Sequence, residues 1–158
     1  MKVAIGSDHA GYEVKEAVKK TLHDLGLEYE DFGTHSGVSV DYPDFAGRVA
    51  EAVSQGRVEQ GLLICGSGIG MSIVANKLPR VRAAVCHNAE TARLSREHND
   101  ANVLAIGART TPIKTIDEII RTFFNTPFAG GHHARRVEKI KALEDRWSND
   151  HMTSEKIQ

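Results

Sequence analysis

Residues 61–76 read GLLICGSGIGMSIVAN, and this stretch determines the fold of the chain. An apolar run of strand length ends at Cys65, and a glycine-rich turn follows it. The spacing of Ile69, Ile73 and Val74 is then typical of the first turns of a helix. Because a helix N-terminus offers unpaired N–H groups and a partial positive charge, we expect the turn to hold an anion and to favour the thiolate form of Cys65.

Three other interpretations of this turn compete with an anion site. In the simplest, Cys65 is a small buried residue at a strand end, and the glycines only permit a tight turn. A dinucleotide-binding loop, Gly-x-Gly-x-x-Gly, would need a third glycine where this chain has Met71. A cysteine phosphatase loop would need an arginine six residues after the nucleophile, and that position is also Met71. The last two are therefore disfavoured, whereas the structural interpretation stays open.

Length and composition indicate a single domain of ordinary globular type. We expect residues 1–147 to form one α/β domain and residues 148–158 to form a frayed polar tail. The net charge of −1 gives no sign of binding to nucleic acid or to an anionic membrane surface, so a small polar ligand is expected. The chain lacks an apolar segment long enough for a signal sequence or a membrane span, and it has only two cysteines. These features predict a cytoplasmic protein with reduced thiols.

Short apolar runs alternate with helical patterns along the chain. The predicted strands cover residues 3–6, 29–32, 61–65, 82–86 and 102–106. A helical pattern follows each strand, and a last helix carries an apolar stripe of Val137, Ile140, Leu143 and Trp147. Because right-handed crossovers place helices on both faces of a parallel sheet, we expect a three-layer α/β/α, Rossmann-like fold with five parallel strands.

Polar residues collect where the predicted strands end. They are Asp8 and His9 after the first strand, Tyr42 beyond the second, and Arg109 after the fifth. Ligands of such sheets bind beyond the C-terminal ends of the strands, where Cys65 also lies. Each residue alone has a simpler explanation, since Asp8 could only cap a helix and His9 could only lie at the surface. Their convergence on one edge favours a binding site.

His98 and Asn99 do not fit that edge. They lie at the end of a predicted helix and before the fifth strand, which places them about 15 Å of strand away from Cys65. If His98 is catalytic, we therefore expect it to act in the site of a neighbouring subunit. Alternatively, the segment only ends the helix, with His98 interacting favourably with the helix dipole.

Several motifs stand in a characteristic order and spacing. They are Ser7-Asp8-His9-Ala10-Gly11-Tyr12, Asp41-Tyr42-Pro43, Cys65-Gly66-Ser67-Gly68-Ile69-Gly70, Ala75-Asn76-Lys77, Ser95-Arg96-Glu97-His98-Asn99-Asp100-Ala101-Asn102, and Gly130-Gly131 before a basic helix. Together they resemble the type B ribose-5-phosphate isomerase family over roughly residues 2–145. The wider family also contains galactose-6-phosphate and allose-6-phosphate isomerases, so the resemblance implies the reaction type more firmly than the substrate.

The resemblance implies a metal-independent and cofactor-free interconversion of ribose 5-phosphate and ribulose 5-phosphate through an enediolate, in the non-oxidative pentose phosphate pathway. Cys65 matches the family's base, and His98 matches its acid and base for opening the sugar ring. The N–H groups of Gly66, Ser67, Gly68, Ile69 and Gly70 would hold the enediolate oxygen, with the Ser67 hydroxyl adding a further hydrogen bond. The family also implies a homodimer with shared active sites, or a dimer of such dimers.

Further positions match residues that bind the substrate in this family. Asp8 and Asn99 match sugar-binding positions, Tyr42 lies in the second motif, and His9, Arg109 and Arg136 correspond to phosphate ligands. One departure concerns the residue after Gly130-Gly131, where the family usually has an arginine and this chain has His132. We expect His132 to meet the phosphate there, and the affinity for phosphate or the preferred sugar to differ as a result.

Two alternatives to a ribose-5-phosphate isomerase stay open, and a third is disfavoured. The substrate could be another sugar phosphate, with four or six carbons, because the loop at residues 33–40 decides the length of the pocket. The chain could instead be a regulatory module that binds phosphate or a nucleotide without chemistry. A metal-dependent enzyme is disfavoured. No two of the candidate ligands have the spacing of a zinc site on a helix, except for the adjacent His132 and His133, which would point apart. The candidates are His9, His87, His98, His132 and His133.

Overall fold

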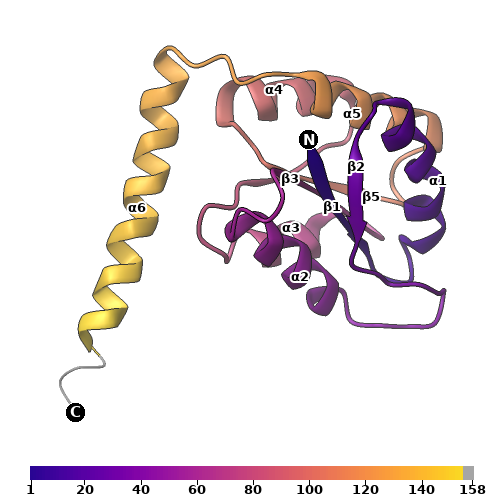
Figure 1. Ribbon diagram of the computed structural model, residues 1–158, viewed down its shortest axis with the longest axis horizontal. Helices are drawn as coiled ribbons and strands as arrows, with labels where there is room; N and C mark the ends of the chain where they lie inside the picture. The colour runs from indigo at the N-terminus through magenta and orange to yellow at the C-terminus, as the bar shows by residue number, and fades with distance from the viewer. Residues whose placement is uncertain (155–158) are drawn as a thin grey trace.

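The computed structural model describes the backbone of residues 1–154 and the side chains of residues 1–147. The strands are β1 (Lys2–Ser7), β2 (Glu28–Asp31), β3 (Gln60–Cys65), β4 (Ala83–Val85) and β5 (Val103–Gly107). The helices are α1 (Tyr12–Asp24), α2 (Tyr42–Ser54), α3 (Ile69–Ala75), α4 (Ala89–Asn99), α5 (Ile113–Asn125) and α6 (His132–Ser154). Strands and helices alternate as far as Asn125, as the hydrophobic pattern predicts (Figure 1).

The five strands form one sheet in the order β2-β1-β3-β5-β4, and every neighbouring pair is parallel. β3 lies at the centre, and all six of its residues are buried. Cys65 at the end of β3 pairs with Gly107 at the end of β5. The C-terminal ends of these strands therefore lie at one edge of the sheet, and the predicted five-stranded parallel fold is confirmed.

Helices cover both faces of the sheet and form two separate apolar cores (Figure 1). The side chains of α1, α4 and α5 pack on one face, with Phe123 and Leu22 among those fully buried. The side chains of α2 and α3 pack on the other face, around Val49 and Met71. This arrangement is the predicted three-layer α/β/α fold, and it leaves the edge beyond Cys65 uncovered by the layers.

Two glycines allow the turn after β3 to lie against β5. Gly68 has a φ of 79°, in the left-handed region that favours glycine, and a Cβ there would lie 3.0 Å from the carbonyl carbon of Ile106. A Cβ at Gly107 would lie 2.8 Å from the backbone oxygen of Ser67. A side chain at either position would therefore push the turn, and Cys65 with it, away from the sheet edge.

The last helix, α6, lies outside the three layers and runs beside them (Figure 1). Of its predicted apolar stripe, Val137 is buried, whereas Ile140, Leu143 and Trp147 are 46%, 48% and 57% exposed. The backbone stays helical as far as Ser154, so α6 extends into the segment expected to form a frayed tail. Residues 155–158 lie outside the described residues. The stripe is thus present in the sequence, but a single chain buries only its first residue.

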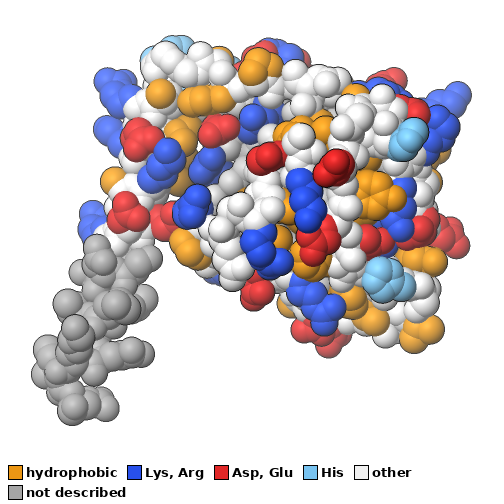
Figure 2. All heavy atoms as spheres, viewed as in Figure 1, with side chains coloured by type: hydrophobic (Ala, Val, Ile, Leu, Met, Phe, Trp, Pro, Cys, Tyr) orange, Lys and Arg blue, Asp and Glu red, His pale blue; other side chains and the backbone are white. Residues whose placement is uncertain are grey.

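The surface matches the balanced composition of the chain. On the face that Figure 2 shows, acidic and basic side chains are intermixed rather than gathered into one basic area. None of the described helices combines the length and the apolar character needed to cross a membrane.

Candidate active site

Cys65 ends β3 and is held by the turn that follows it. Its side chain is 5% exposed, and its Sγ accepts a hydrogen bond from the Gly68 N–H at 3.1 Å. The Ile69 N–H donates to Ser67 Oγ at 3.3 Å. Two of the N–H groups expected to hold an enediolate oxygen are therefore already engaged inside the turn, one of them by the thiol itself.

A cavity of about 430 Å³ opens in front of this turn. The residues that line it are Asp8, His9, Ala10, Tyr42, Cys65, Gly66, Ser67, Gly70, Arg109 and Thr110. The structure thus brings most of the predicted site residues from the C-terminal strand ends together. Gly68 and Ile69 do not line the cavity, because Gly68 is buried against β5 and the side chain of Ile69 is 54% exposed.

Asp8 and His9 are fixed by backbone groups just after β1. Asp8 is 7% exposed, and its Oδ1 accepts a hydrogen bond from the Gly11 N–H at 3.0 Å. His9 Nδ1 lies 3.2 Å from the backbone nitrogen of Val40 and 3.3 Å from its carbonyl oxygen. The Val40 N–H can donate to His9 Nδ1 in one tautomer, and the Val40 carbonyl can accept from it in the other. This contact connects the loop at residues 33–41 to the cavity.

Tyr42 and Arg109 each line the cavity and contact the glycine turn. A Cβ at Gly70 would lie 2.7 Å from Tyr42 Cζ, so the tyrosine ring packs directly on the backbone of Gly70. A Cβ at Gly66 would lie 3.6 Å from Arg109 Nη1, and the Arg109 N–H donates to the Gly66 carbonyl at 3.0 Å. The guanidinium of Arg109 is thereby placed beside the turn, where it can meet an anionic group.

The remaining predicted site residues form a second group around the end of α4 and the start of α6. The rings of His98 and His133 stack with centroids 4.2 Å apart and planes inclined by 13°. The rings of His132 and His133 lie 3.9 Å apart at an angle of 40°, so the prediction that these adjacent side chains point apart is wrong. Because Arg136 follows one turn further along α6, this group combines three imidazoles with a guanidinium.

The surroundings of His133 disfavour a positive charge on its ring. Loss of solvent lowers the pKa of His133, and the positive charges of His132, His98 and Arg136 lower it further, while the Glu97 carboxylate acts in the opposite direction. The neutral form of His133 is therefore favoured.

Arginine side chains fix the corner that follows His98. Asp100 adopts a left-handed conformation with a φ of 47°, and its carboxylate accepts hydrogen bonds from Arg96 and Arg82, each at 3.0 Å. Arg82 Nε also donates to the backbone oxygen of Asn99 at 3.2 Å. These contacts hold the end of α4 in one orientation before the chain enters β5.

The cavity around Cys65 and the group around His98 lie at opposite ends of the parallel strands (Figure 1). Cys65 stands at the C-terminal end of β3, whereas His98 precedes β5 and therefore lies near its N-terminal end. A strand of this length spans about 15 Å, which is too far for one small substrate to touch both groups within a chain. The position predicted for His98 is thus the position that the structure has.

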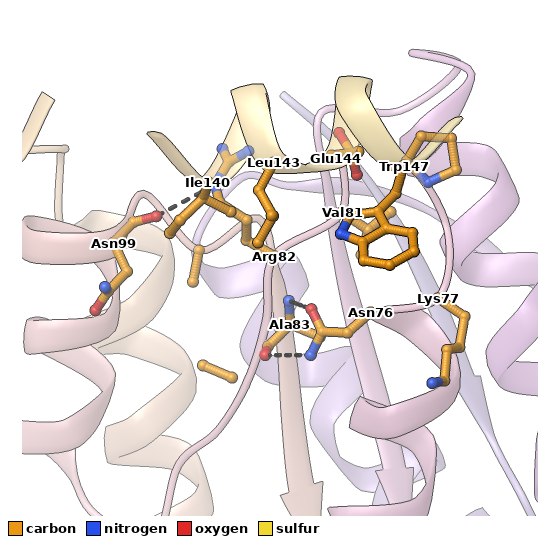
Figure 3. A pocket seen from close by; sticks show the side chains of 13 residues that line it. Asn76, Lys77, Val81, Arg82, Ala83, Asn99, Ile140, Leu143, Glu144 and Trp147 are labelled. Carbon is orange, nitrogen blue, oxygen red and sulfur yellow. Dashed lines mark hydrogen bonds between the residues drawn. The ribbon is translucent and has the colours of Figure 1, made fainter. Parts of the chain in front are cut away.

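A groove of about 600 Å³ separates α6 from the edge of the sheet (Figure 3). Figure 3 shows Ile140, Leu143 and Trp147 of α6 facing Val81 and Ala83 across it. The Asn76 side chain makes two hydrogen bonds with the backbone of Ala83, at 2.8 and 2.9 Å. Asn76 thereby occupies hydrogen-bonding groups of the edge strand β4.

Sequence reasoning missed four residues of these two groups. Ala10 and Thr110 line the cavity, and Val40 contacts His9. His133 was considered only as a metal ligand, although its place beside His132 in the last motif could have signalled a role. Within the described part of the chain, no three or more His, Cys, Asp or Glu side chains are grouped to hold a metal ion.

A parallel α/β sheet with a cysteine, a carboxylate and an arginine converging beyond its strand ends is the arrangement of an enzyme that acts on a small anionic molecule. A family model described as Ribose/Galactose Isomerase matches residues 3–140. The chain belongs to this family and is a sugar phosphate isomerase, which confirms the resemblance drawn from the motifs.

Individual relatives are similar over nearly their whole length. Ribose-5-phosphate isomerase B of Escherichia coli is 44% identical over 92% of this chain and 97% of its own. D-erythrulose-4-phosphate isomerase of Pectobacterium atrosepticum is 40% identical over 91% and 95%. The structure of ribose-5-phosphate isomerase B of Clostridium thermocellum matches with a TM-score of 0.90 and 51% identity, over 93% of this chain and 99% of that one.

Proposed function

We propose that this isomerase interconverts ribose 5-phosphate and ribulose 5-phosphate, with Cys65 as the base. The observation that carries the proposal is the cavity at the end of β3, where Cys65, Ser67 and Asp8 converge beside the cationic side chain of Arg109. The names of the Escherichia coli and Clostridium thermocellum relatives support the five-carbon substrate. The cavity supplies the base and the polar groups that such a reaction needs.

The first step opens the furanose ring. A histidine near neutrality can take the proton of the anomeric hydroxyl and give a proton to the ring oxygen, which breaks the bond between the ring oxygen and C1. His98 is the proposed acid and base. Because it lies at the other edge of its own chain, we assign this step to His98 of the partner subunit, with Asp8 and the partner's Asn99 holding the sugar hydroxyls.

The second step moves hydrogen between two carbons. The Cys65 thiolate removes the C2 proton, the electron pair forms the enediolate, and the resulting thiol returns the proton to C1. The hydroxyl proton passes from O2 to O1, a transfer for which the Ser67 hydroxyl can both accept and donate. The N–H groups of the turn that are not engaged by Cys65 or Ser67 stabilise the developing negative charge.

The phosphate binds between cationic groups of both chains. His9 and Arg109 flank the cavity in one chain, and His132 and Arg136 lie with His98 in the second group. If His98 of the partner subunit reaches the sugar, the partner's His132 and Arg136 come with it. Each active site would thus depend on both chains.

Exposed apolar residues support a homodimer. Ile69 and Ile73 on α3 are 54% and 55% exposed, and Ile140, Leu143 and Trp147 of the α6 stripe are exposed to a similar extent. Apolar residues gathered in this way on a small protein mark an interaction surface. A second copy of the chain offers the same apolar residues, so a twofold interface could bury both sets at once.

A coupled assay that follows ribulose 5-phosphate formed from ribose 5-phosphate tests the proposal. We expect turnover that a chelator leaves unchanged and that Cys65→Ala abolishes. A protein that binds ribose 5-phosphate without turnover would instead be a binding module, and loss of turnover on chelation would require a metal. Either result would refute the proposed function.

A four-carbon substrate is the second candidate. The Pectobacterium atrosepticum relative is a D-erythrulose-4-phosphate isomerase, and this chain has His132 where the resemblance to the family implies an arginine. Parallel measurement of kcat/KM for ribose 5-phosphate, erythrose 4-phosphate, allose 6-phosphate and galactose 6-phosphate decides between them.

A further inference from the structure

We propose that His133 is a positioning residue for His98, holding the imidazole that opens the sugar ring in the orientation it needs for proton transfer. This inference rests on the proposed function, because it concerns the ring-opening step. It assigns a role to a residue that none of the motif arguments placed in the site.

The stack of the two rings is the geometric basis. His98 and His133 come from different helices, α4 and α6, and their ring planes are nearly parallel at a centroid distance of 4.2 Å. A flat contact of this kind restricts rotation of the His98 ring about its side-chain torsions. It leaves the ring edge, which carries both nitrogen atoms, free to exchange protons with a substrate.

The surrounding backbone makes the stack effective. The hydrogen bonds from Arg82 and Arg96 to the Asp100 carboxylate fix the end of α4. The Ala129 N–H donates to the Glu97 carbonyl at 3.1 Å and so connects the segment before α6 to α4. Both helices are therefore held at the point where the rings meet. With the backbone fixed, the orientation of the His98 ring is the remaining freedom, and His133 limits it.

The charge state of His133 suits this role. His98 contacts the His133 ring and interacts with the Glu90 carboxylate of its own helix. The groups that act on His133 are His132, His98 and Arg136, which are cationic when protonated, and the Glu97 carboxylate. A second fixed positive charge against His98 would oppose protonation of the His98 ring when it takes a proton from the sugar. Because burial and the neighbouring cations lower the pKa of His133, it presents an uncharged ring instead.

Steady-state kinetics with ribose 5-phosphate test the proposal in four proteins. His133→Ala removes the ring, His133→Phe keeps a flat ring without ionisable nitrogens, and His133→Gln keeps a polar side chain of similar length without a ring. His23→Ala removes an exposed histidine at the end of α1 and is the matched control. Wild-type turnover of ribose 5-phosphate comes first, because its absence would refute the proposed function rather than this inference.

We expect His133→Ala and His133→Gln to lower kcat about 10- to 100-fold with less than a threefold change in KM, because misplacement of a catalytic group costs about this much. His133→Phe should recover kcat to within about fivefold of wild type, and His23→Ala should match wild type. Equal losses in the Ala, Gln and Phe variants would overturn the proposal, as would a change confined to KM, which would make His133 a phosphate ligand.

A double-mutant comparison separates positioning from general structural damage. If His133 acts through His98, adding His133→Ala to a His98→Ala protein should cause less than a twofold further loss. A further loss as large as in the wild-type background would mean that the two residues act independently, and the proposal would be wrong. The pH dependence of kcat gives a second readout, since its acid limb should move in His133→Ala and stay in place in His23→Ala.

Discussion

Cys65 and His98, at opposite ends of the strands, are held in place by different kinds of contact. Cys65 is held by its own turn, because the Gly68 N–H that contacts its Sγ is only three residues away. The orientation of His98 depends on a contact between two helices that are far apart in the sequence, because its ring stacks on His133 of α6. Substitutions at Cys65 should therefore change chemistry alone, whereas substitutions around His98 should reveal how the second group is assembled.

Replacement of Cys65 by alanine should lower kcat by at least about 10²- to 10⁴-fold, the contribution typical of a general base, with little change in KM. The fold should persist, because removing one sulphur atom at a strand end leaves a small cavity. Turnover by the coupled assay and the thermal unfolding midpoint check both statements. Wild-type turnover in this variant would exclude Cys65 as the base.

Cys86→Ala is the matched control, since Cys86 is also a buried thiol but lies outside the cavity. Burial raises the pKa of Cys86, and its hydrogen bonds with Ser95 and Thr91 offset this only in part, so its thiolate is scarce at neutral pH. Iodoacetamide should consequently modify Cys65 faster than Cys86, and ribose 5-phosphate should protect Cys65. Peptide mass spectrometry after timed alkylation distinguishes the two thiols.

His132→Arg should lower KM for ribose 5-phosphate at pH 8 by about tenfold, which corresponds to about 1.4 kcal/mol. A histidine loses its positive charge as the pH rises through neutrality, whereas an arginine keeps its charge and can bind phosphate with two hydrogen bonds. KM of the wild type should therefore increase between pH 6 and 8, and the increase should be smaller in the variant. Identical KM profiles at constant ionic strength would place His132 outside the phosphate site.

Among the elements, the loop between β2 and α2 depends on a buried ion cluster. Lys15 is fully buried, and its Nζ lies 2.5 Å from Asp31 Oδ2, which Lys19 also approaches at 2.8 Å. The other carboxylate oxygen, Asp31 Oδ1, accepts the Gly33 N–H at 2.9 Å. The loop that this bond anchors reaches Val40, which contacts His9, so the cluster links the packing of α1 to the cavity.

Asp31→Asn should lower the free energy of unfolding by about 3 kcal/mol, because it leaves Lys15 buried without its main counterion. Asp24→Asn, which removes the partner of the exposed Lys20, is the control and should leave the free energy of unfolding nearly unchanged, because solvent screens a surface ion pair. Urea unfolding at pH 7 measures both values. Equal effects of the two substitutions would mean that the Lys15 cluster contributes no more than a surface pair.

The effect of Asp31 should depend on pH. Burial raises the pKa of Asp31, but hydrogen bonds from Lys15 and Lys19 outweigh it and bring the pKa below its ordinary value of 3.8. The unfolded chain therefore binds this proton at a higher pH than the folded chain, and the stabilisation is complete above about pH 4 and is lost as the pH falls through the lowered pKa. The difference between wild type and Asp31→Asn should shrink in that acidic window.

For the whole molecule, the proposed dimer explains why one chain has its functional groups at two edges. The cavity around Cys65 and the histidine group at α4 and α6 are each well ordered by their own contacts, yet no substrate could touch both within a chain. The exposed stripe of α6 begins in the same helix that carries His132 and His133. If that stripe docks on a second copy of the chain, the histidine group at α4 and α6 lies close to that copy as well.

Cys65→Ala protein and His98→Ala protein, each with only residual activity, should together recover activity once their subunits exchange. Random exchange gives mixed dimers with one intact site each, so about a quarter of the wild-type activity should return. Exchange can be followed independently by native mass spectrometry. A mixture that stays inactive after demonstrated exchange would mean that both residues serve the site of one chain.

The local sequence pattern was sufficient to predict much of the fold and the part of the site around Cys65. The strand, cysteine and glycine turn at residues 61–76 predicted the corner that holds Cys65, because period and glycine positions act over a few residues. Parallel strands then require that Asp8, Tyr42 and Arg109 reach the same edge. The strand boundaries follow less directly from the pattern, because β2 begins and ends one residue earlier than the predicted range of 29–32.

The alternation of strands and helices, the edge at which the polar residues converge, and the separation of His98 from Cys65 all follow from the residue pattern alone. The strand order, the burial of Lys15 against Asp31, the packing of Tyr42 on Gly70 and the stack of His98 on His133 follow only from the folded chain. Each of these contacts joins residues that are distant in the chain, so its formation depends on how whole elements pack rather than on any local period. The apolar stripe of α6 is visible in the sequence, but that it stays exposed follows only from the position of the helix outside the three layers.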